Sequence, residues 1–168
     1  PKSIFITAMD TRPLAADPQV ALAGREEDFN TGAAAVAKLS GGKTFLCRAP
    51  GSKLGDGVPG VQVEEFGGPH PAGLPGTHIH TLDPVNRAKV VWHINYAEVA
   101  NIGALLRTGR LDLTRVVALA GPAVKKPRLV KTRVGASLST LLDGELNPGA
   151  NRVISGSVLA GRQAFNDK

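Results

Sequence analysis

The chain has 168 residues and a formal charge of +6, and its single cysteine, Cys47, excludes an internal disulfide framework and any zinc or iron–sulfur site built from several cysteines. No run of about 18 apolar residues is present, so no segment is predicted to span a membrane. Because the chain begins with Pro1 and its only methionine is Met9, we expect it to be cut from a longer protein.

The first two thirds of the chain alternate between strand and helix patterns. Short apolar runs bounded by glycine, proline or charged residues predict strands, and apolar residues near a spacing of 3.6 predict helices. Asp17 before a proline, and Asn95 before the second long helix, are expected helix caps. Strands and helices in this order favour a parallel sheet of the α/β class. The predicted strands are 3–8, 43–47, 61–66 and 89–94, the predicted helices are 25–39 and 96–106, and 67–80 is predicted to lack regular structure.

After about residue 113 the pattern changes to that of a small β-grasp module. We expect strands at 115–120 and 128–134, a short helix at 137–142, and strand pieces at 152–155 and 158–159. The charge changes at the same place, because residues 1–113 hold 11 basic and 11 acidic side chains whereas residues 114–168 hold 9 and 3. The sequence therefore predicts two domains, 1–113 and 114–168.

Two aspartates follow the first predicted strand, at the end where open α/β sheets bind their ligands. Asp10 and Asp17 could each accept a hydrogen bond from a ribose or ribityl hydroxyl. The simpler interpretation is that Asp10 makes a turn with its own backbone and that Asp17 caps a helix. No GxGxxG sequence follows this strand, so the usual dinucleotide fingerprint is absent.

The loop 67–80 contains three of the four histidines, His70, His78 and His80. A strand would place His78 and His80 on one face, and a metal would then need a third ligand such as His70 or Asp83. The alternative, which we favour, is a rigid loop whose histidines bond to backbone groups, so no metal site is predicted. Prolines in the loop lack N–H groups, which weakens the case for a phosphate cradle.

The only tryptophan and the only tyrosine stand close together at a predicted junction between strand and helix. Trp92 could form an aromatic wall of a ligand cleft. Packing of Trp92 into the core is the simpler interpretation.

A basic run, which includes Lys125, Lys126 and Arg128, precedes and enters the strand 128–134. Such a face could meet an acidic protein, an anionic membrane surface or nucleic acid, or it could simply be solvated. None of the seven aromatic residues interleaves with this run to stack on bases, so nucleic acid is not expected as a partner. No motif for a catalytic triad, a zinc protease or a P-loop is present, and no catalytic residue is predicted.

Several long strings of the sequence resemble the A subunits of the sodium-translocating NADH:quinone reductases. The most specific is Gly-Pro-His-Pro-Ala-Gly-Leu-Pro-Gly-Thr-His-Ile-His at 68–80. More distantly, the chain is similar to the flavin-binding subunit of proton-pumping NADH:quinone reductase and to the C subunit of the Rnf complex. In that flavin-binding subunit, a Rossmann-like domain holds FMN and precedes a β-grasp module called SLBB. The other strings that resemble the A subunits lie at 4–18, 91–96, 115–122, 126–129 and 152–158.

This resemblance implies a Rossmann-like parallel-sheet domain followed by an SLBB-type β-grasp domain. It implies a peripheral subunit on the cytoplasmic side of the bacterial inner membrane, in a complex that couples electron transfer from NADH to ubiquinone with sodium export. The glycine-rich loop of the flavin subunit has no counterpart here, and Thr11 and Arg12 follow Asp10 where that subunit has further acids. We therefore expect no redox centre in this chain, with FMN, FAD and a 2Fe-2S cluster in other subunits.

Taken together, these observations predict a scaffold that docks on other subunits and is a candidate for contact with ubiquinone. An alternative is a stand-alone module that binds a flavin or a nucleotide, and another is a purely structural scaffold. The predicted ligand contacts are Asp10, His70, His78, His80 and Trp92, and the predicted docking residues are Lys125, Lys126 and Arg128.

Overall fold

The computed structural model describes residues 1–164, and the chain divides into two compact units. Unit 1 contains Pro1–Thr11 and Asp17–Asp112, and unit 2 contains Arg12–Ala16 and the chain from Leu113 onward. Within residues 1–164, no helix is both long enough and apolar enough to cross a bilayer.

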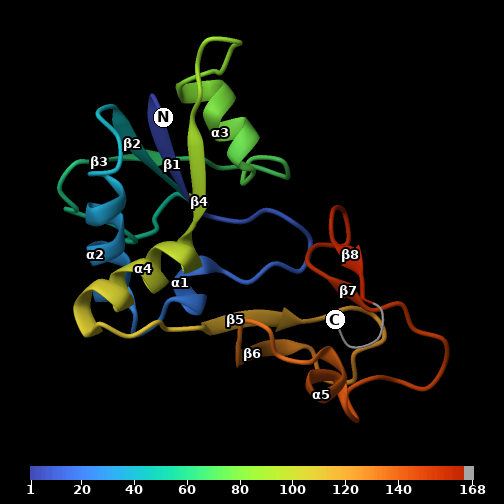
Figure 1. Ribbon diagram of the computed structural model, residues 1–168. Helices are drawn as coiled ribbons and strands as arrows, with labels where there is room; N and C mark the ends of the chain where they lie inside the picture. The colour runs from blue at the N-terminus through green and yellow to red at the C-terminus, as the bar shows by residue number, and fades with distance from the viewer. Residues whose placement is uncertain (165–168) are drawn as a thin grey trace. The chain divides into compact units, whose positions relative to one another are not determined.

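Unit 1 is built on a parallel sheet of four strands, β1 (Ser3–Ala8), β2 (Lys43–Arg48), β3 (Val61–Glu65) and β4 (Trp92–Asn95), in the order β3-β2-β1-β4 (Figure 1). Every residue of β1 is buried, as expected for a central strand of a sheet that is covered on both faces. The predicted α/β class with a parallel sheet is confirmed. The order of strand addition reverses between β1 and β4, so the switch point of the sheet lies between these two strands.

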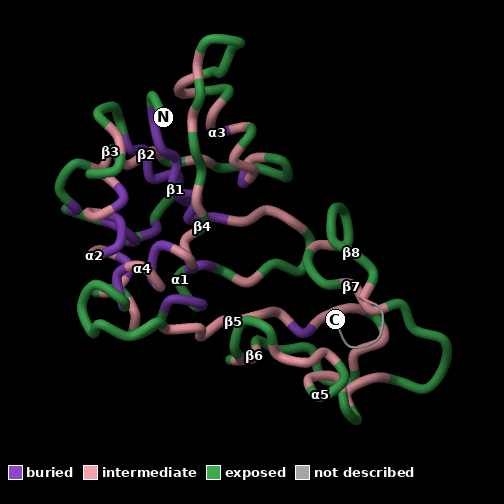
Figure 2. The backbone as a smooth tube through the Cα atoms, in the orientation of Figure 1, coloured by how far each residue is buried: buried purple, intermediate pink, exposed green. Residues whose placement is uncertain are grey.

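The main core of unit 1 lies between one face of the sheet and the helices α2 (Glu26–Val36) and α4 (Tyr96–Thr108). Ile4, Ile6 and Leu46 supply the strand side of this core, and Phe29 and Val99 supply the helix side. A short helix, α1 (Pro18–Ala21), precedes α2. The buried residues in Figure 2 gather in these elements of unit 1.

The opposite face of the sheet carries a smaller apolar cluster under α3 (Pro75–Leu82). Phe5 and Phe45 stack with their ring centroids 4.9 Å apart, and Ile79 and Leu82 of α3 pack against them. The expectation of no regular structure at 67–80 is therefore wrong for its last part. Pro75 occupies the first helical turn, where proline fits because its missing N–H has no partner there.

The predicted helix caps are found at the expected residues. The Asp17 carboxylate accepts a hydrogen bond from the Gln19 N–H at 2.8 Å, and the Asn95 amide oxygen accepts one from the Ala97 N–H at 2.9 Å. Gly109 ends α4 with φ of 69°, a backbone conformation that favours glycine.

Helices α2 and α4 touch at two glycines, Gly32 and Gly103. A Cβ built on Gly32 would lie 1.9 Å from the Val99 carbonyl oxygen, and one built on Gly103 would lie 1.7 Å from the Asp28 carbonyl oxygen. Only glycine lets the two backbones approach this closely.

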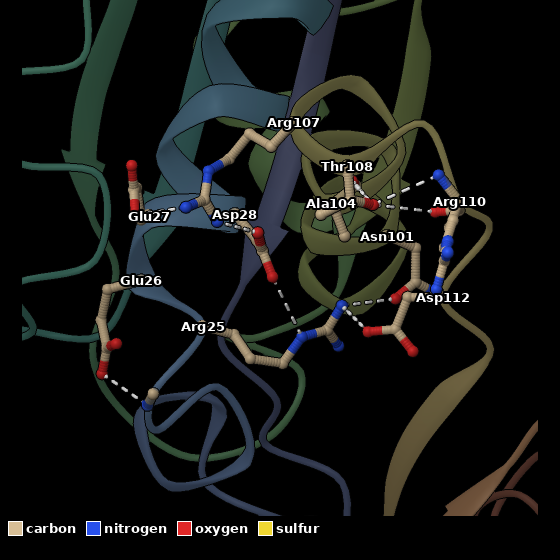
Figure 3. A network of polar contacts seen from close by, with 11 residues as sticks. Arg25, Glu26, Glu27, Asp28, Asn101, Ala104, Arg107, Thr108, Arg110 and Asp112 are labelled. Atoms are coloured by element: carbon tan, nitrogen blue, oxygen red, sulfur yellow. Dashed lines mark hydrogen bonds and ion pairs between the residues drawn. The ribbon is translucent and has the colours of Figure 1, made fainter.

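Beside this contact, a polar network joins the same two helices (Figure 3). Arg25 donates to Asn101 at 2.9 Å and pairs with Asp112 at 2.8 Å. Arg107 pairs with Glu27 and Asp28, each at 2.5 Å. The network and the glycine contact together fix how α2 crosses α4.

Unit 2 contains an antiparallel pair, β5 (Thr114–Leu119) and β6 (Arg128–Arg133), the short helix α5 (Leu138–Leu142), and a second pair, β7 (Ile154–Ser155) and β8 (Arg162–Gln163). The predicted strand at 158–159 is wrong, because residues 157–160 turn between β7 and β8. The Gly161 N–H donates to the Ser157 carbonyl at 2.6 Å and closes this turn. Two small antiparallel pairs with one short helix fit the expected small β domain.

Candidate functional site

The carboxyl ends of β1 and β4, on either side of the switch point, form the candidate site of unit 1. Thr7 and Asn95 are neighbours in the β1–β4 register, and Asp10 follows β1 at this end of the sheet. The Thr7 hydroxyl is buried and has no hydrogen-bond partner among residues 1–164. A buried polar atom without a protein partner normally bonds to water or to a ligand, and the Thr44 hydroxyl, Arg48 Nε and His78 Nδ1 of unit 1 are in the same position.

The first part of the 67–80 segment is fastened to this edge through Thr11. The Thr11 hydroxyl lies 3.2 Å from His70 Nδ1 and accepts a hydrogen bond from the Gly73 N–H at 2.9 Å. A Cβ on Gly73 would lie 2.6 Å from the Thr11 nitrogen, so the loop approaches closely because Gly73 has no side chain. The structure therefore brings His70 to the same edge as Asp10. Thr11 was not among the predicted contacts, since a threonine after a strand carries no signal by itself.

His78 and His80 do not share a face, because they lie on α3 rather than on a strand. Residues two apart on a helix point in nearly opposite directions. His78 is fully buried, with Nε2 at 2.8 Å from the Ala72 carbonyl oxygen and its ring centroid 4.3 Å from that of Phe66, the two rings being tilted by 44°. His80 is exposed. Of these two histidines, only His80 is accessible to a ligand at the surface.

The buried position of His78 leads to a prediction about acid stability. Burial lowers the pKa of His78 below its usual range, and the contact with Ala72 offsets this in part. In the unfolded chain the same histidine takes up a proton as the pH falls through about 6.5. The stabilisation from the neutral His78 is therefore complete above that pH and is lost as the pH falls toward the folded pKa.

We expect the free energy of unfolding to decrease between about pH 8 and pH 5.5, and the variant His78→Gln to show a smaller decrease. Urea titrations of each protein at pH 8 and at pH 5.5 measure the free energy of unfolding. His93→Gln is the matched control, because His93 is exposed on β4. Equal pH dependence in the wild type and in His78→Gln would contradict this role for His78.

Trp92 is not a core residue, since 53% of its surface is exposed, and the core interpretation of Trp92 is wrong. It begins β4, the edge strand of the sheet, and pairs with Ile4 rather than with the last residues of β1. Trp92 thus lies away from the end that carries Asp10 and His70. The five predicted contacts do not all converge on one edge.

Two of the three predicted docking residues have partners inside unit 2. Arg128 forms two hydrogen bonds of 2.7 Å with the Glu145 carboxylate, and this pair holds the pKa of Glu145 below its usual range. The Lys125 ammonium donates to the Gly144 carbonyl at 2.8 Å. Lys126 is exposed between them. Lys125 and Arg128 of the basic run therefore stabilise the segment 144–145 in addition to carrying charge.

The chemistry of the candidate site is that of hydrogen bonding rather than nucleophilic attack. Cys47 lies on β2 next to Thr7, but burial raises the pKa of its thiol to about 12, with a further contribution from Glu64. A buried thiol whose pKa is raised this far is a poor nucleophile near neutral pH. In residues 1–164, no three His, Cys, Asp or Glu side chains gather closely enough to hold a metal ion.

Comparison with known proteins gives consistent matches along the chain. The family model described as the NqrA second alpha/beta domain matches residues 1–111, and the one described as the NQRA C-terminal domain matches residues 116–166. Proteins named as the A subunit of Na(+)-translocating NADH-quinone reductase are similar to this chain over nearly its whole length. The relative from Marinomonas sp. (strain MWYL1) is 59% identical over 165 residues, which is 98% of this chain and 37% of the relative.

Other relatives of the same name give similar values. The one from Pseudomonas aeruginosa (strain UCBPP-PA14) is 57% identical over 98% of this chain and 37% of its own length. The one from Rhodopirellula baltica is 54% identical over 98% of this chain and 36% of its own length. The chain thus spans little more than a third of the curated relatives it matches. Because a single family model matches more than half of its residues, the chain belongs to the NqrA family, of which it carries the second alpha/beta domain followed by the C-terminal domain.

Proposed function

We propose that the chain works as part of the A subunit in a membrane complex that transfers electrons from NADH to ubiquinone and exports sodium ions. The identity of 59% over 98% of the chain to a relative of that name carries this proposal. In this proposal the chain is peripheral, lies on the cytoplasmic side of the bacterial inner membrane, and comprises the domains 1–113 and 114–168. Electrons pass through FMN, FAD and a 2Fe-2S cluster in other subunits, and this chain has no redox centre of its own.

Within the complex, the chain acts as a scaffold whose candidate site contacts ubiquinone. The buried hydroxyl of Thr7 and the fastened loop that carries His70 support a ligand at the carboxyl ends of β1 and β4. A quinone presents carbonyl oxygens, which accept hydrogen bonds from an imidazole or a hydroxyl. The contacts in this proposal at this edge are Asp10 and His70, with buried His78 holding α3 in place. Exposed His80 on α3 and Trp92 at the start of β4 would touch only a part of the ligand that extends beyond this edge.

Unit 2 docks on other subunits through its basic run. Of the predicted residues, exposed Lys126 presents its charge to solvent. Lys125 bonds to the Gly144 carbonyl and Arg128 to the Glu145 carboxylate, and these contacts hold the neighbouring segment in place. An acidic surface on a neighbouring subunit would complement this run.

The test of the quinone contact uses the intact natural complex with the variant His70→Ala. We expect the KM for ubiquinone to rise about fivefold with little change in kcat, since one hydrogen bond to the substrate is lost. His93→Ala is the matched control, being an exposed histidine on β4 outside the proposed contacts. An unchanged KM in an assembled complex would contradict a quinone contact at His70 and favour the purely structural role. Tightly bound flavin in unit 1 would overturn the assignment of all redox centres to other subunits.

A further inference from the structure

A groove of about 550 Å³ opens at the amino ends of the strands of unit 1, at the opposite end of the sheet from the candidate site. Its walls come from the start of β1, the turn before β2 and the loop between α3 and β4, which meet near the end marked N in Figure 1. The volume lies within the range typical of sites for small organic ligands. β1 has six residues, so roughly 17 Å of strand separate this groove from the carboxyl edge.

Backbone contacts hold the groove open in a defined shape. The Lys2 N–H donates to the Val90 carbonyl at 2.8 Å and ties the start of the chain to the loop before β4. A Cβ on Gly42 would lie 1.7 Å from the Lys2 carbonyl oxygen, so the turn before β2 can pass there only because residue 42 is glycine. Within the loop, the Lys89 N–H donates to the Asn86 carbonyl at 3.1 Å. The lining residues are therefore placed by ordered backbone on three sides.

The groove carries a surplus of positive charge. Three lysines, Lys2, Lys43 and Lys89, line it together with one carboxylate, Asp83. That carboxylate is already engaged, because it pairs with the Lys89 ammonium and accepts a hydrogen bond from the Ser3 hydroxyl at 2.7 Å. The Lys89 and Ser3 contacts hold the pKa of Asp83 below its usual range, and nearby Lys43 adds to the effect. Among the residues that the structure describes, the groove offers no second carboxylate to balance Lys2 and Lys43.

Two apolar side chains also line the groove. They are Phe45, which is only 3% exposed, and Leu82, and Phe5 backs the Phe45 ring with centroids 4.9 Å apart. The Lys43 ammonium lies 5.9 Å from the centre of the Phe45 ring, where the face of the ring attracts a cation. This contact places the Lys43 ammonium beside the apolar lining of the groove.

We propose that this groove binds a small organic dianion, a phosphate monoester with a flat apolar body. Two surplus ammonium groups match the charge of a phosphate monoester, which is close to −2 at neutral pH, better than the single charge of a carboxylate. Lysine binds phosphate as a point charge, and the side chains of Phe45 and Leu82 offer apolar contact to the body of the ligand. The site is independent of the proposed quinone contact, because it uses none of the same residues.

The test titrates phenyl phosphate, inorganic phosphate and phenol into the intact natural protein that contains residues 1–168, by calorimetry at low salt. We expect saturable binding of phenyl phosphate at millimolar concentration or below, with weaker binding of phosphate, which lacks the ring, and of phenol, which lacks the charge. Lys43→Glu should weaken the binding of phenyl phosphate by about tenfold or more, because it replaces an attraction by a repulsion. Lys53→Glu is the matched control, since exposed Lys53 lies outside the groove and undergoes the same change of charge.

Equal weakening by Lys43→Glu and Lys53→Glu would show a general charge effect and overturn the site. Equal binding of phosphate and phenyl phosphate would show that Phe45 and Leu82 do not contact the ligand. Absence of saturable binding of phenyl phosphate would overturn the whole proposal. Lys2→Gln gives a second variant just before the neighbouring strand β1, where we expect a weaker loss than for charge reversal. Thermal unfolding of each variant, followed by circular dichroism, confirms that the fold is intact.

Discussion

Replacing Gly103 by alanine is expected to destabilise unit 1 by about 3 kcal/mol or more. The new methyl group would lie 1.7 Å from the carbonyl oxygen of Asp28 and 2.7 Å from the nitrogen of Gly32. Both of these are backbone atoms of α2, so no side-chain rotation can relieve the clash. The two helices would have to move apart, which strains the core between Phe29 and Val99 and the ion pairs drawn in Figure 3.

Urea unfolding of Gly103→Ala measures this loss directly. The control is Gly76→Ala in α3, where an added Cβ would meet nothing within 4 Å. On helix propensity alone both changes should stabilise, by up to about 1 kcal/mol in a helix interior. A loss of stability in Gly103→Ala together with a gain in Gly76→Ala would therefore show that the contact between α2 and α4 is the cause. A Gly103→Ala protein as stable as the wild type would show that α2 and α4 are not held in close contact.

The parts of the fold that the sequence predicted are those that local chemistry determines. The buried strand 3–8 and the caps Asp17 and Asn95 all depend on neighbours in the chain. The parallel sheet followed from the alternation of strands and helices, because a parallel pair needs a long crossover. The family resemblance, carried by the string at 68–80, is confirmed by relatives over nearly the whole chain.

The parts that could not be predicted depend on contacts between distant segments. A glycine in the middle of a helix normally weakens it, yet Gly103 is the point where α2 fits against α4. A histidine pair in a loop rich in proline suggested one shared face, but α3 places His78 in the core and leaves His80 outside. Trp92 suggested core packing by its type, yet β4 lies at the edge of the sheet. Residue type and spacing do not reveal which strand will be at the edge.

Arg48 is expected to be the other sensitive position, because a buried guanidinium there holds the loop between β2 and β3. Its side chain is 9% exposed, donates to the Leu54 carbonyl at 2.8 Å, and pairs with Asp56 at 2.5 Å and with Glu65 at 3.5 Å. Arg48→Met keeps much of the packing volume but leaves the buried Leu54 carbonyl without its donor. We expect a loss of about 2 kcal/mol, mainly from that unpaired carbonyl, because both carboxylates are about half exposed and stay solvated.

The matched control is Arg107→Met, since Arg107 also pairs with two carboxylates, Glu27 and Asp28, but its own side chain is 36% exposed. We expect a much smaller loss there, because solvent screens exposed ion pairs and can replace them. A second readout is local: trypsin should cleave after exposed Lys53 faster in Arg48→Met than in Arg107→Met, since the loop opens more often. Equal stability losses and equal cleavage rates in the two variants would show that burial of Arg48 does not secure this loop. Arg48→Lys should be intermediate, because an ammonium keeps the charge but cannot reach the carbonyl and both carboxylates together.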